Sequence, residues 1–129
     1  MTSLSAVQRV LIIEDCVEDD LLLELAFEEQ APEVQVKVVS DGASAVACCQ
    51  SPEPPQLVLL DLHLPGQMGW EVLAQLRAAA AGPFQVVCYS SYAHPAEVQA
   101  VLDQGAVAYL ERPWELEGFS ALVRALLAR

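Results

Sequence analysis

The stretch LVLLDLHLPG, residues 57–66, decides the fold, because four consecutive apolar residues run directly into the carboxylate of Asp61 and then into a Pro-Gly turn. A continuous apolar run is typical of a strand that is covered on both faces, as strands in a parallel sheet are. In an open parallel sheet, ligands bind outside the carboxyl ends of the strands. Asp61 stands at such an end, so the stretch predicts both a parallel sheet and a functional carboxylate at its edge.

Four more short apolar runs repeat this pattern along the chain. They are VLII (10–13), VQVKVV (34–39), FQVVCY (84–89) and AVAYL (106–110). Segments with helical spacing follow the five runs, at residues 17–29, 42–50, 70–80, 96–104 and 116–127. Five strands alternating with five helices predict one doubly wound α/β sheet with helices on both faces. The run at 34–39 alternates polar and apolar residues, which favours an edge strand.

The overall composition limits the classes of function. With 129 residues and a net charge of −12, we expect one domain over residues 1–129, with a core over about 8–127, and no nucleic-acid partner. No apolar run approaches the roughly 20 residues of a membrane span, and the N-terminus has no signal-peptide pattern, so we expect a cytoplasmic protein without a membrane partner. The four cysteines form no CxxC pair, which favours reduced thiols over a zinc site or disulfides.

Two carboxylates, Glu14 and Asp15, follow the run at 10–13. If the first and third strands are neighbours, both side chains converge on Asp61. Like charges at this spacing raise each other's proton affinity unless a cation lies among them, and Mg²⁺ prefers such hard oxygen ligands. The alternative is that the negative charges of Glu14 and Asp15 only stabilise the electropositive N-terminus of the next helix. This is the role that we expect for residues 18–20.

Two other strand ends bring polar groups to the same edge. Ser90 and Ser91 follow the run at 84–89, and Arg112 follows the run at 106–110. A carboxylate nucleophile, a metal-binding acid pair, a hydroxyl and a cation together indicate a phosphoryl-transfer site, where positioning and charge neutralisation supply most of the catalysis.

The chain resembles the CheY-like receiver domain of bacterial two-component response regulators over nearly its whole length. The segments that carry the resemblance are LIIEDC (11–16), LVLLDLHLPGQMGWEVL (57–73), VVCYSS (86–91) and GAVAYLERPW (105–114). The resemblance implies a flavodoxin-like sheet with strand order 2-1-3-4-5. It also implies a receiver of the stand-alone type, for which we expect no output domain.

The resemblance further implies a role for each site residue. Asp61 would accept a phosphoryl group from a partner histidine kinase. Glu14, Asp15 and Asp61 would hold Mg²⁺, together with the backbone carbonyl of His63. Beyond its own phosphorylation and dephosphorylation, we expect no enzymatic activity.

Two residues would couple phosphorylation to shape. Ser90 would be the switch hydroxyl, and we favour it over Ser91 because it lies fifteen positions before Gly105, the usual spacing in the family. Tyr109 would be the aromatic residue that turns inward when this hydroxyl moves.

The chain departs from the family at Arg112, where a lysine is usual. A guanidinium is planar and pairs through a fork, so the two residues are not interchangeable. Arg112 would either neutralise the phosphoryl group or pair with one of the site carboxylates and hold an inactive arrangement. The family also implies a cis Arg112–Pro113 bond.

The partners follow from the same reading. We expect a sensor histidine kinase, with a phytochrome-type kinase as a refinement, and an unidentified downstream protein. In the last helix, Leu116 and Phe119 begin an apolar stripe that predicts core, while the opposite side carries small residues, namely Gly118, Ala121 and Ala125. That side is either ordinary surface or a contact for a partner or a homodimer.

Two features of the sequence bear on other functions. The substitution at Arg112 leaves open a phosphorylation-independent interaction module that keeps the fold without the switch. A hydrolase or a nucleotide-binding flavodoxin-like protein would need a glycine-rich loop after the first strand. The sequence there is EDCVEDD (14–20), which is acidic and contains no glycine.

Overall fold

The computed structural model describes residues 7–80 and 82–128, in which strands and helices alternate. The strands are β1 (Arg9–Ile13), β2 (Gln35–Val39), β3 (Leu57–Asp61), β4 (Gln85–Ser90) and β5 (Ala108–Glu111). The helices are α1 (Val17–Gln30), α2 (Gly42–Cys49), α3 (Gly69–Ala79), α4 (Pro95–Asp103) and α5 (Leu116–Leu127). All ten predicted elements are present, and their ends differ from the predicted ends by at most two residues.

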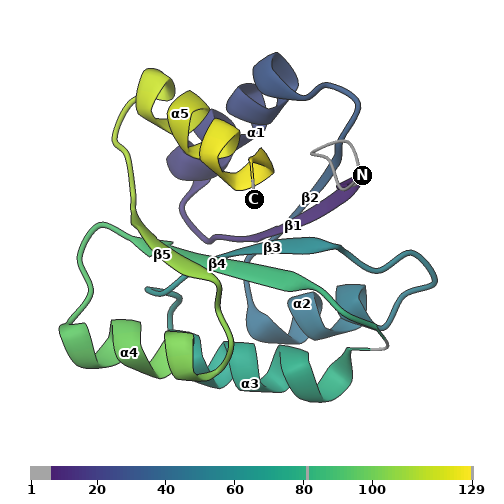
Figure 1. Ribbon diagram of the computed structural model, residues 1–129, viewed down its shortest axis with the longest axis vertical. Coiled ribbons are helices and arrows are strands. Elements are labelled where there is room, and N and C mark those ends of the chain that lie inside the picture. The colour runs from purple at the N-terminus through teal and green to yellow at the C-terminus, as the bar shows by residue number, and fades with distance from the viewer. Residues whose placement is uncertain (1–6, 81, 129) are drawn as a thin grey trace.

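The five strands form one parallel sheet in the order β2-β1-β3-β4-β5. Helices α1 and α5 cover one face, and α2, α3 and α4 cover the other, so the molecule has three layers (Figure 1). The predicted doubly wound fold and its strand order are confirmed. Strand β2 is an edge strand, as its alternating sequence predicts, and β3 is buried at every position.

The sheet separates two apolar cores, because successive residues of a strand point to opposite faces. Leu11 and Leu60 pack toward α2, α3 and α4, whereas Ile12 and Leu59 pack toward α1 and α5. All four side chains are at most 1% exposed. The central strands β1 and β3 are therefore apolar on both sides, and their polar residues are confined to their ends.

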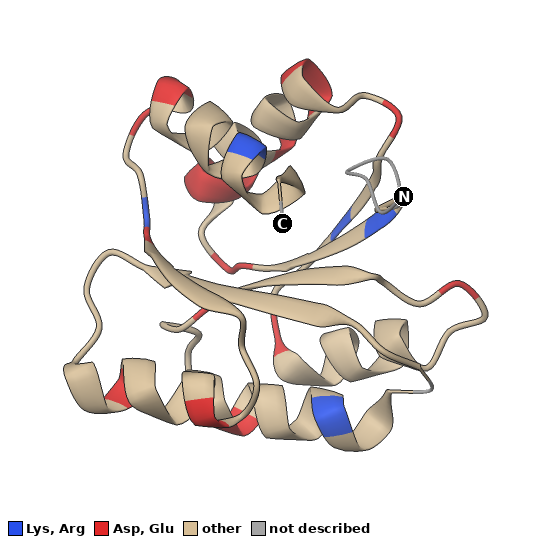
Figure 2. Cartoon of the chain, in the orientation of Figure 1, with Lys and Arg blue, Asp and Glu red and all other residues tan. Residues whose placement is uncertain are grey.

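Acidic residues far outnumber basic residues in this chain. The chain has 18 acidic and six basic residues, and Figure 2 shows the basic ones on several different elements. None of the described helices has both the length and the apolar composition needed to cross a bilayer.

Helix α5 buries the predicted apolar stripe. Phe119, Val123, Leu126 and Leu127 are buried, and Leu116 is partly buried. On the opposite side Ala121 and Ala125 are exposed, as predicted, but Gly118 is not open surface. A Cβ atom at Gly118 would lie 2.7 Å from Cβ of Pro113, so the chain itself occupies that space.

The implied cis bond at Arg112–Pro113 is wrong. No peptide bond among the described residues is cis, so this one is trans. The trans bond leads the chain from β5 into the contact between Pro113 and the first turn of α5.

The contact at Gly118 predicts an unusual sign for a helical substitution. Replacing glycine by alanine inside a helix ordinarily stabilises a protein by up to about 1 kcal/mol. Because the new methyl group would overlap the rigid ring of Pro113, we expect Gly118→Ala to lower the free energy of unfolding by about 1–3 kcal/mol. Urea denaturation followed by circular dichroism measures the change.

Gly82→Ala is the matched control, since a Cβ atom there would meet nothing within 4 Å. This control should be neutral or slightly stabilising. Equal or greater stability of Gly118→Ala relative to the unsubstituted protein would contradict the packing described here.

Candidate functional site

Three carboxylates meet at the carboxyl edge of the sheet because β1 and β3 are neighbours. Ile13 pairs with Leu60, so the residues that follow each of them, Glu14 and Asp61, lie side by side. One carboxylate oxygen from each of Glu14, Asp15 and Asp61 lies within 4.8 Å of the others. The structure therefore brings together the acid cluster that the sequence predicts.

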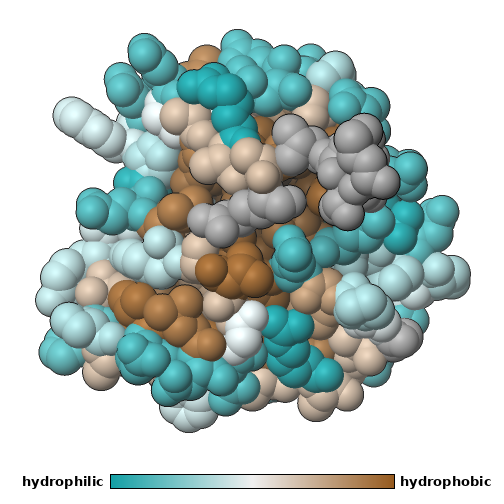
Figure 3. Space-filling view, in the orientation of Figure 1, coloured by the Kyte–Doolittle hydropathy of each residue, from teal (hydrophilic) through white to brown (hydrophobic). Residues whose placement is uncertain are grey.

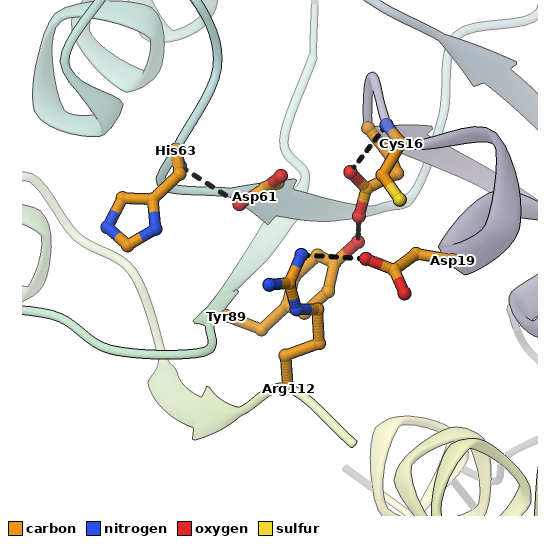
Figure 4. Close-up of polar contacts among 7 residues, drawn as sticks. Cys16, Asp19, Asp61, His63, Tyr89 and Arg112 are labelled. Atoms are coloured by element: carbon orange, nitrogen blue, oxygen red, sulfur yellow. Dashed lines mark hydrogen bonds and ion pairs between the residues drawn. The ribbon is translucent and has the colours of Figure 1, made fainter. Parts of the chain in front are cut away.

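The three carboxylates differ in exposure. Glu14 and Asp61 are each only 2% exposed, whereas Asp15 is open to solvent. The backbone N–H of His63 donates a hydrogen bond of 2.9 Å to Oδ1 of Asp61, which fixes the orientation of that carboxylate (Figure 4). His63 thus lies beside Asp61, and the role of its carbonyl as a metal ligand stays a prediction.

Glu14 is held more firmly than an ordinary surface glutamate. Its backbone N–H donates to the carbonyl of Val39 on the neighbouring strand, at 2.9 Å. Its Oε2 accepts a 3.0 Å hydrogen bond from the backbone N–H of Cys16, and its Oε1 accepts one from the hydroxyl of Tyr89. Each carboxylate oxygen therefore already has one donor.

Burial dominates the electrostatics of this cluster. The pKa of Glu14 is raised to about 7, mainly by burial and also by the neighbouring Asp61, while the hydrogen bonds from Tyr89 and Cys16 oppose the rise. Burial also raises the pKa of Tyr89, so its phenol keeps its proton and acts as the donor. A set of three hard oxygen donors with little countercharge suits a divalent cation such as Mg²⁺ or Mn²⁺. The residues present therefore fit a metal ion.

A pair of hydroxyls lies at the neighbouring strand ends. Ser90 is completely buried at the end of β4, whereas Ser91 is exposed. The Oγ of Ser90 lies 2.8 Å from the hydroxyl of Tyr109 on β5. Tyr109 is thus turned toward the site, and the two residues that the family resemblance links are in direct contact.

Arg112 pairs with none of the three site carboxylates. Its Nη1 lies 2.7 Å from Oδ2 of Asp19 in the first turn of α1, and the two side chains are 25% and 15% exposed (Figure 4). The expectation that Asp19 only favours the helix start is therefore wrong, since its carboxylate also holds the guanidinium. Partial burial of Arg112 lowers the pKa of its guanidinium, but the negative charges of Asp19, Asp61 and Glu14 outweigh this effect and raise the pKa above its usual value.

Sequence reasoning missed Tyr89. Tyr89 places a phenol at the end of the largely apolar run FQVVCY (84–89), directly before Ser90, and this was the signal available. A buried tyrosine hydroxyl needs a hydrogen-bond partner, but the sequence does not say that the partner is Glu14, which lies 75 positions away.

Comparison with known proteins agrees with this geometry. Residues 10–124 match the response regulator receiver domain family. The chain is 38% identical over 122 residues to the sensory transduction protein RegX3 of Mycolicibacterium smegmatis, which covers 93% of this chain and 50% of that protein. It is 33% identical over 120 residues to the transcriptional regulatory protein KdpE of Mycobacterium tuberculosis, over 93% and 51% of the two chains. The chain spans about half the length of these curated relatives.

Solved structures give the same result. The Mn²⁺-bound form of response regulator Rcp1 has a TM-score of 0.76 at 26% identity, over 92% of this chain and 90% of that chain. The phosphorylated cyanobacterial phytochrome response regulator RcpA has a TM-score of 0.79 at 25% identity, with the same coverage. The bacteriophytochrome response regulator RtBRR has a TM-score of 0.71 at 30% identity, over 93% and 78%. With this fold, this acid cluster and this family match, the chain belongs to the response regulator receiver domains of two-component systems.

Proposed function

We propose that the chain accepts a phosphoryl group on Asp61 from a partner histidine kinase in an Mg²⁺-dependent reaction, and that this modification changes which proteins it binds. The observation that carries the proposal is the buried Asp61 with Glu14 and Asp15 within 4.8 Å. A carboxylate oxygen of Asp61 attacks phosphorus, the bond from phosphorus to the histidine nitrogen breaks, and its electron pair stays on the imidazole. The product is an acyl phosphate on Asp61.

Glu14, Asp15 and Asp61 would hold the Mg²⁺ ion, together with the carbonyl of His63. When bound, the ion supplies positive charge against the oxygens of the transferred group. The protein itself supplies the orientation of Asp61 through the N–H of His63. Burial of Asp61 limits the competing approach of water.

Ser90 and Tyr109 would transmit the modification. The Oγ of Ser90 is the hydroxyl that would bind the phosphoryl oxygens, and it already shares a 2.8 Å hydrogen bond with Tyr109. A hydroxyl that turns toward a new acceptor changes the hydrogen bonding of its partner, so the position of Tyr109 would depend on the state of Asp61. Such coupling through a shared contact is how a local charge change acts on a distant surface.

The kinase would approach beside α1. Val17, Leu21 and Leu25 recur every four residues on α1 and are 71%, 56% and 48% exposed, forming an apolar stripe next to the site. A hollow between α1 and the segment after β5 is lined by residues that include Asp19, Arg112 and Trp114. The phytochrome response regulators among the similar structures support a phytochrome-type kinase as the partner.

The unidentified downstream protein, or a second copy in a homodimer, would bind the face of α4, β5 and α5. Figure 3 shows hydrophobic surface over α4 and the start of β5. Leu102 and Val107 are the large apolar residues exposed there, at 38% and 44%. Tyr109 lies on β5 between this face and Ser90, which supports a link between the face and the site.

The chain would act in the cytoplasm, which agrees with its four unpaired thiols, because reducing compartments keep cysteines free. It would have no enzymatic activity beyond its own phosphorylation and dephosphorylation.

One observation favours the alternative of a phosphorylation-independent interaction module. Arg112, which replaces the usual lysine, is bound by Asp19 instead of reaching Asp61. A receiver whose cation is held away from the acceptor would keep its binding surfaces without the switch. The two experiments below separate these functions.

The first experiment tests the acceptor. Incubation with acetyl phosphate and Mg²⁺ should add one phosphoryl group to the chain, read by intact mass, and Asp61→Asn should abolish the addition. Asp103→Asn makes the same chemical change at an exposed aspartate on α4 and should keep the addition. If Asp61→Asn still gains the added mass, the phosphoryl group is accepted by another residue. If the unsubstituted chain never gains this mass but still binds a partner, the chain is a phosphorylation-independent interaction module.

The second experiment tests whether Asp19 restrains Arg112. A partly exposed ion pair is worth about 0.5–1 kcal/mol, which corresponds to roughly a two- to fivefold change in a rate or an equilibrium. We therefore expect Asp19→Asn to raise the initial rate of phosphorylation of Asp61 about two- to fivefold, because the freed guanidinium neutralises the incoming phosphoryl group.

Glu18→Gln is the matched control, since it removes one negative charge from the same turn but no partner of Arg112 among the described residues. Equal rates for the two variants would show that the Arg112–Asp19 pair does not restrain the reaction. Arg112→Lys, which restores the usual residue, should raise the rate in the same direction.

A further inference from the structure

Tyr89 connects the core of the protein to the acid cluster. Its side chain is 0% exposed and belongs to the apolar core on the α1 and α5 face. In the sheet, Tyr89 pairs with Asp61 of β3, yet its hydroxyl donates to Glu14 at the end of β1, on the far side of β3. Figure 4 shows the ring of Tyr89 reaching from β4 into the group of charged residues.

The contact restricts a carboxylate that would otherwise have several rotamers. Glu14 has three side-chain torsions, and a ligand that occupies one rotamer loses less entropy when it binds an ion. Tyr89 donates to Oε1 and the N–H of Cys16 donates to Oε2, so both ends of the carboxylate are fixed. Each carboxylate oxygen has two lone pairs, so these two donors leave one lone pair on each oxygen, and one oxygen of Glu14 lies within 4.8 Å of carboxylate oxygens of Asp15 and Asp61.

Both donors are uncharged, which suits a metal site. Among the described residues, Arg112 forms its ion pair with Asp19, and the donors to the carboxylate of Glu14 are the neutral hydroxyl of Tyr89 and the backbone N–H of Cys16. Neutral donors orient the carboxylate without cancelling its charge. Hydrogen-bonded carboxylate ligands are a general feature of metal sites, and loss of the outer partner weakens binding.

We propose that Tyr89 is a positioning residue of the divalent-ion site, which holds the carboxylate of Glu14 in the orientation that the ion requires. The proposal rests on the ion site of the proposed function and adds to it a residue outside the acid cluster. A merely structural role would require only that the buried hydroxyl find an acceptor. The positioning role requires that the contact determine ion affinity.

The test is Tyr89→Phe, which keeps the ring in the core and removes only the hydroxyl. Mg²⁺ is titrated into the unphosphorylated protein at pH 8 by isothermal titration calorimetry. We expect Tyr89→Phe to weaken Mg²⁺ binding about tenfold. Tyr92→Phe is the matched control, because it removes a hydroxyl from a tyrosine that is 68% exposed, and it should bind Mg²⁺ as the unsubstituted protein does.

A second measurement separates positioning from stability. Thermal unfolding is followed in EDTA and in Mg²⁺, and the rise in Tm caused by the ion reports its affinity for the folded state. If Tyr89 positions Glu14, Mg²⁺ should raise the Tm of Tyr89→Phe less than it raises the Tm of Tyr92→Phe. If Tyr89 is only structural, Tyr89→Phe should have a lower Tm in EDTA and in Mg²⁺ by the same amount, so the rise caused by the ion would not change.

Affinity and Tm rise equal to those of the control would overturn the role of Tyr89 and leave the ion site intact. Tighter binding by Tyr89→Phe would overturn it too, since the hydroxyl would then compete with the ion. Absence of Mg²⁺ binding by the unsubstituted protein would instead remove the ion site itself, and with it both proposals.

Discussion

Repulsion among three carboxylates at one sheet edge is the constraint on which the rest of the structure depends. Two of the three, Glu14 and Asp61, are buried where their charge is costly. The fold tolerates this because the parallel strands β1 and β3 end side by side and the surrounding hydrogen bonds are directed at the carboxylate oxygens. A cluster of this kind stabilises nothing by itself, but its three carboxylates could hold a metal ion.

The fold was predictable because its signal is local and repeated. Each strand is a short apolar run ending in polar residues, and the continuous run at 57–60 corresponds to β3, the central strand that is buried on both faces. The alternating run at 34–39 likewise corresponds to the edge strand β2. The convergence of Glu14, Asp15 and Asp61 followed once β1 and β3 were placed together. These features depend on strand order and not on the details of side-chain packing.

The two side-chain pairs that sequence reasoning missed are long-range and depend on side-chain placement. The Tyr89–Glu14 hydrogen bond joins residues 75 positions apart, and the Arg112–Asp19 pair joins residues 93 positions apart. Neither pair can be predicted from the spacing of residues in the sequence, because each contact depends on the direction in which a long side chain points at the end of a strand. Gly118 was similarly misread, since its small size serves a contact with Pro113 that no helical pattern encodes.

The contact between Pro113 and Gly118 has a mechanical consequence. Arg112 and Pro113 are adjacent, and the proline ring abuts the first turn of α5 with no room for an additional methyl group. The backbone at Arg112 is therefore not free to shift on its own: a displacement that draws the guanidinium toward the sheet edge presses on the base of α5. The segment after β5 would transmit such a displacement to α5, so the tilt of this helix would depend on the position of the Arg112 guanidinium.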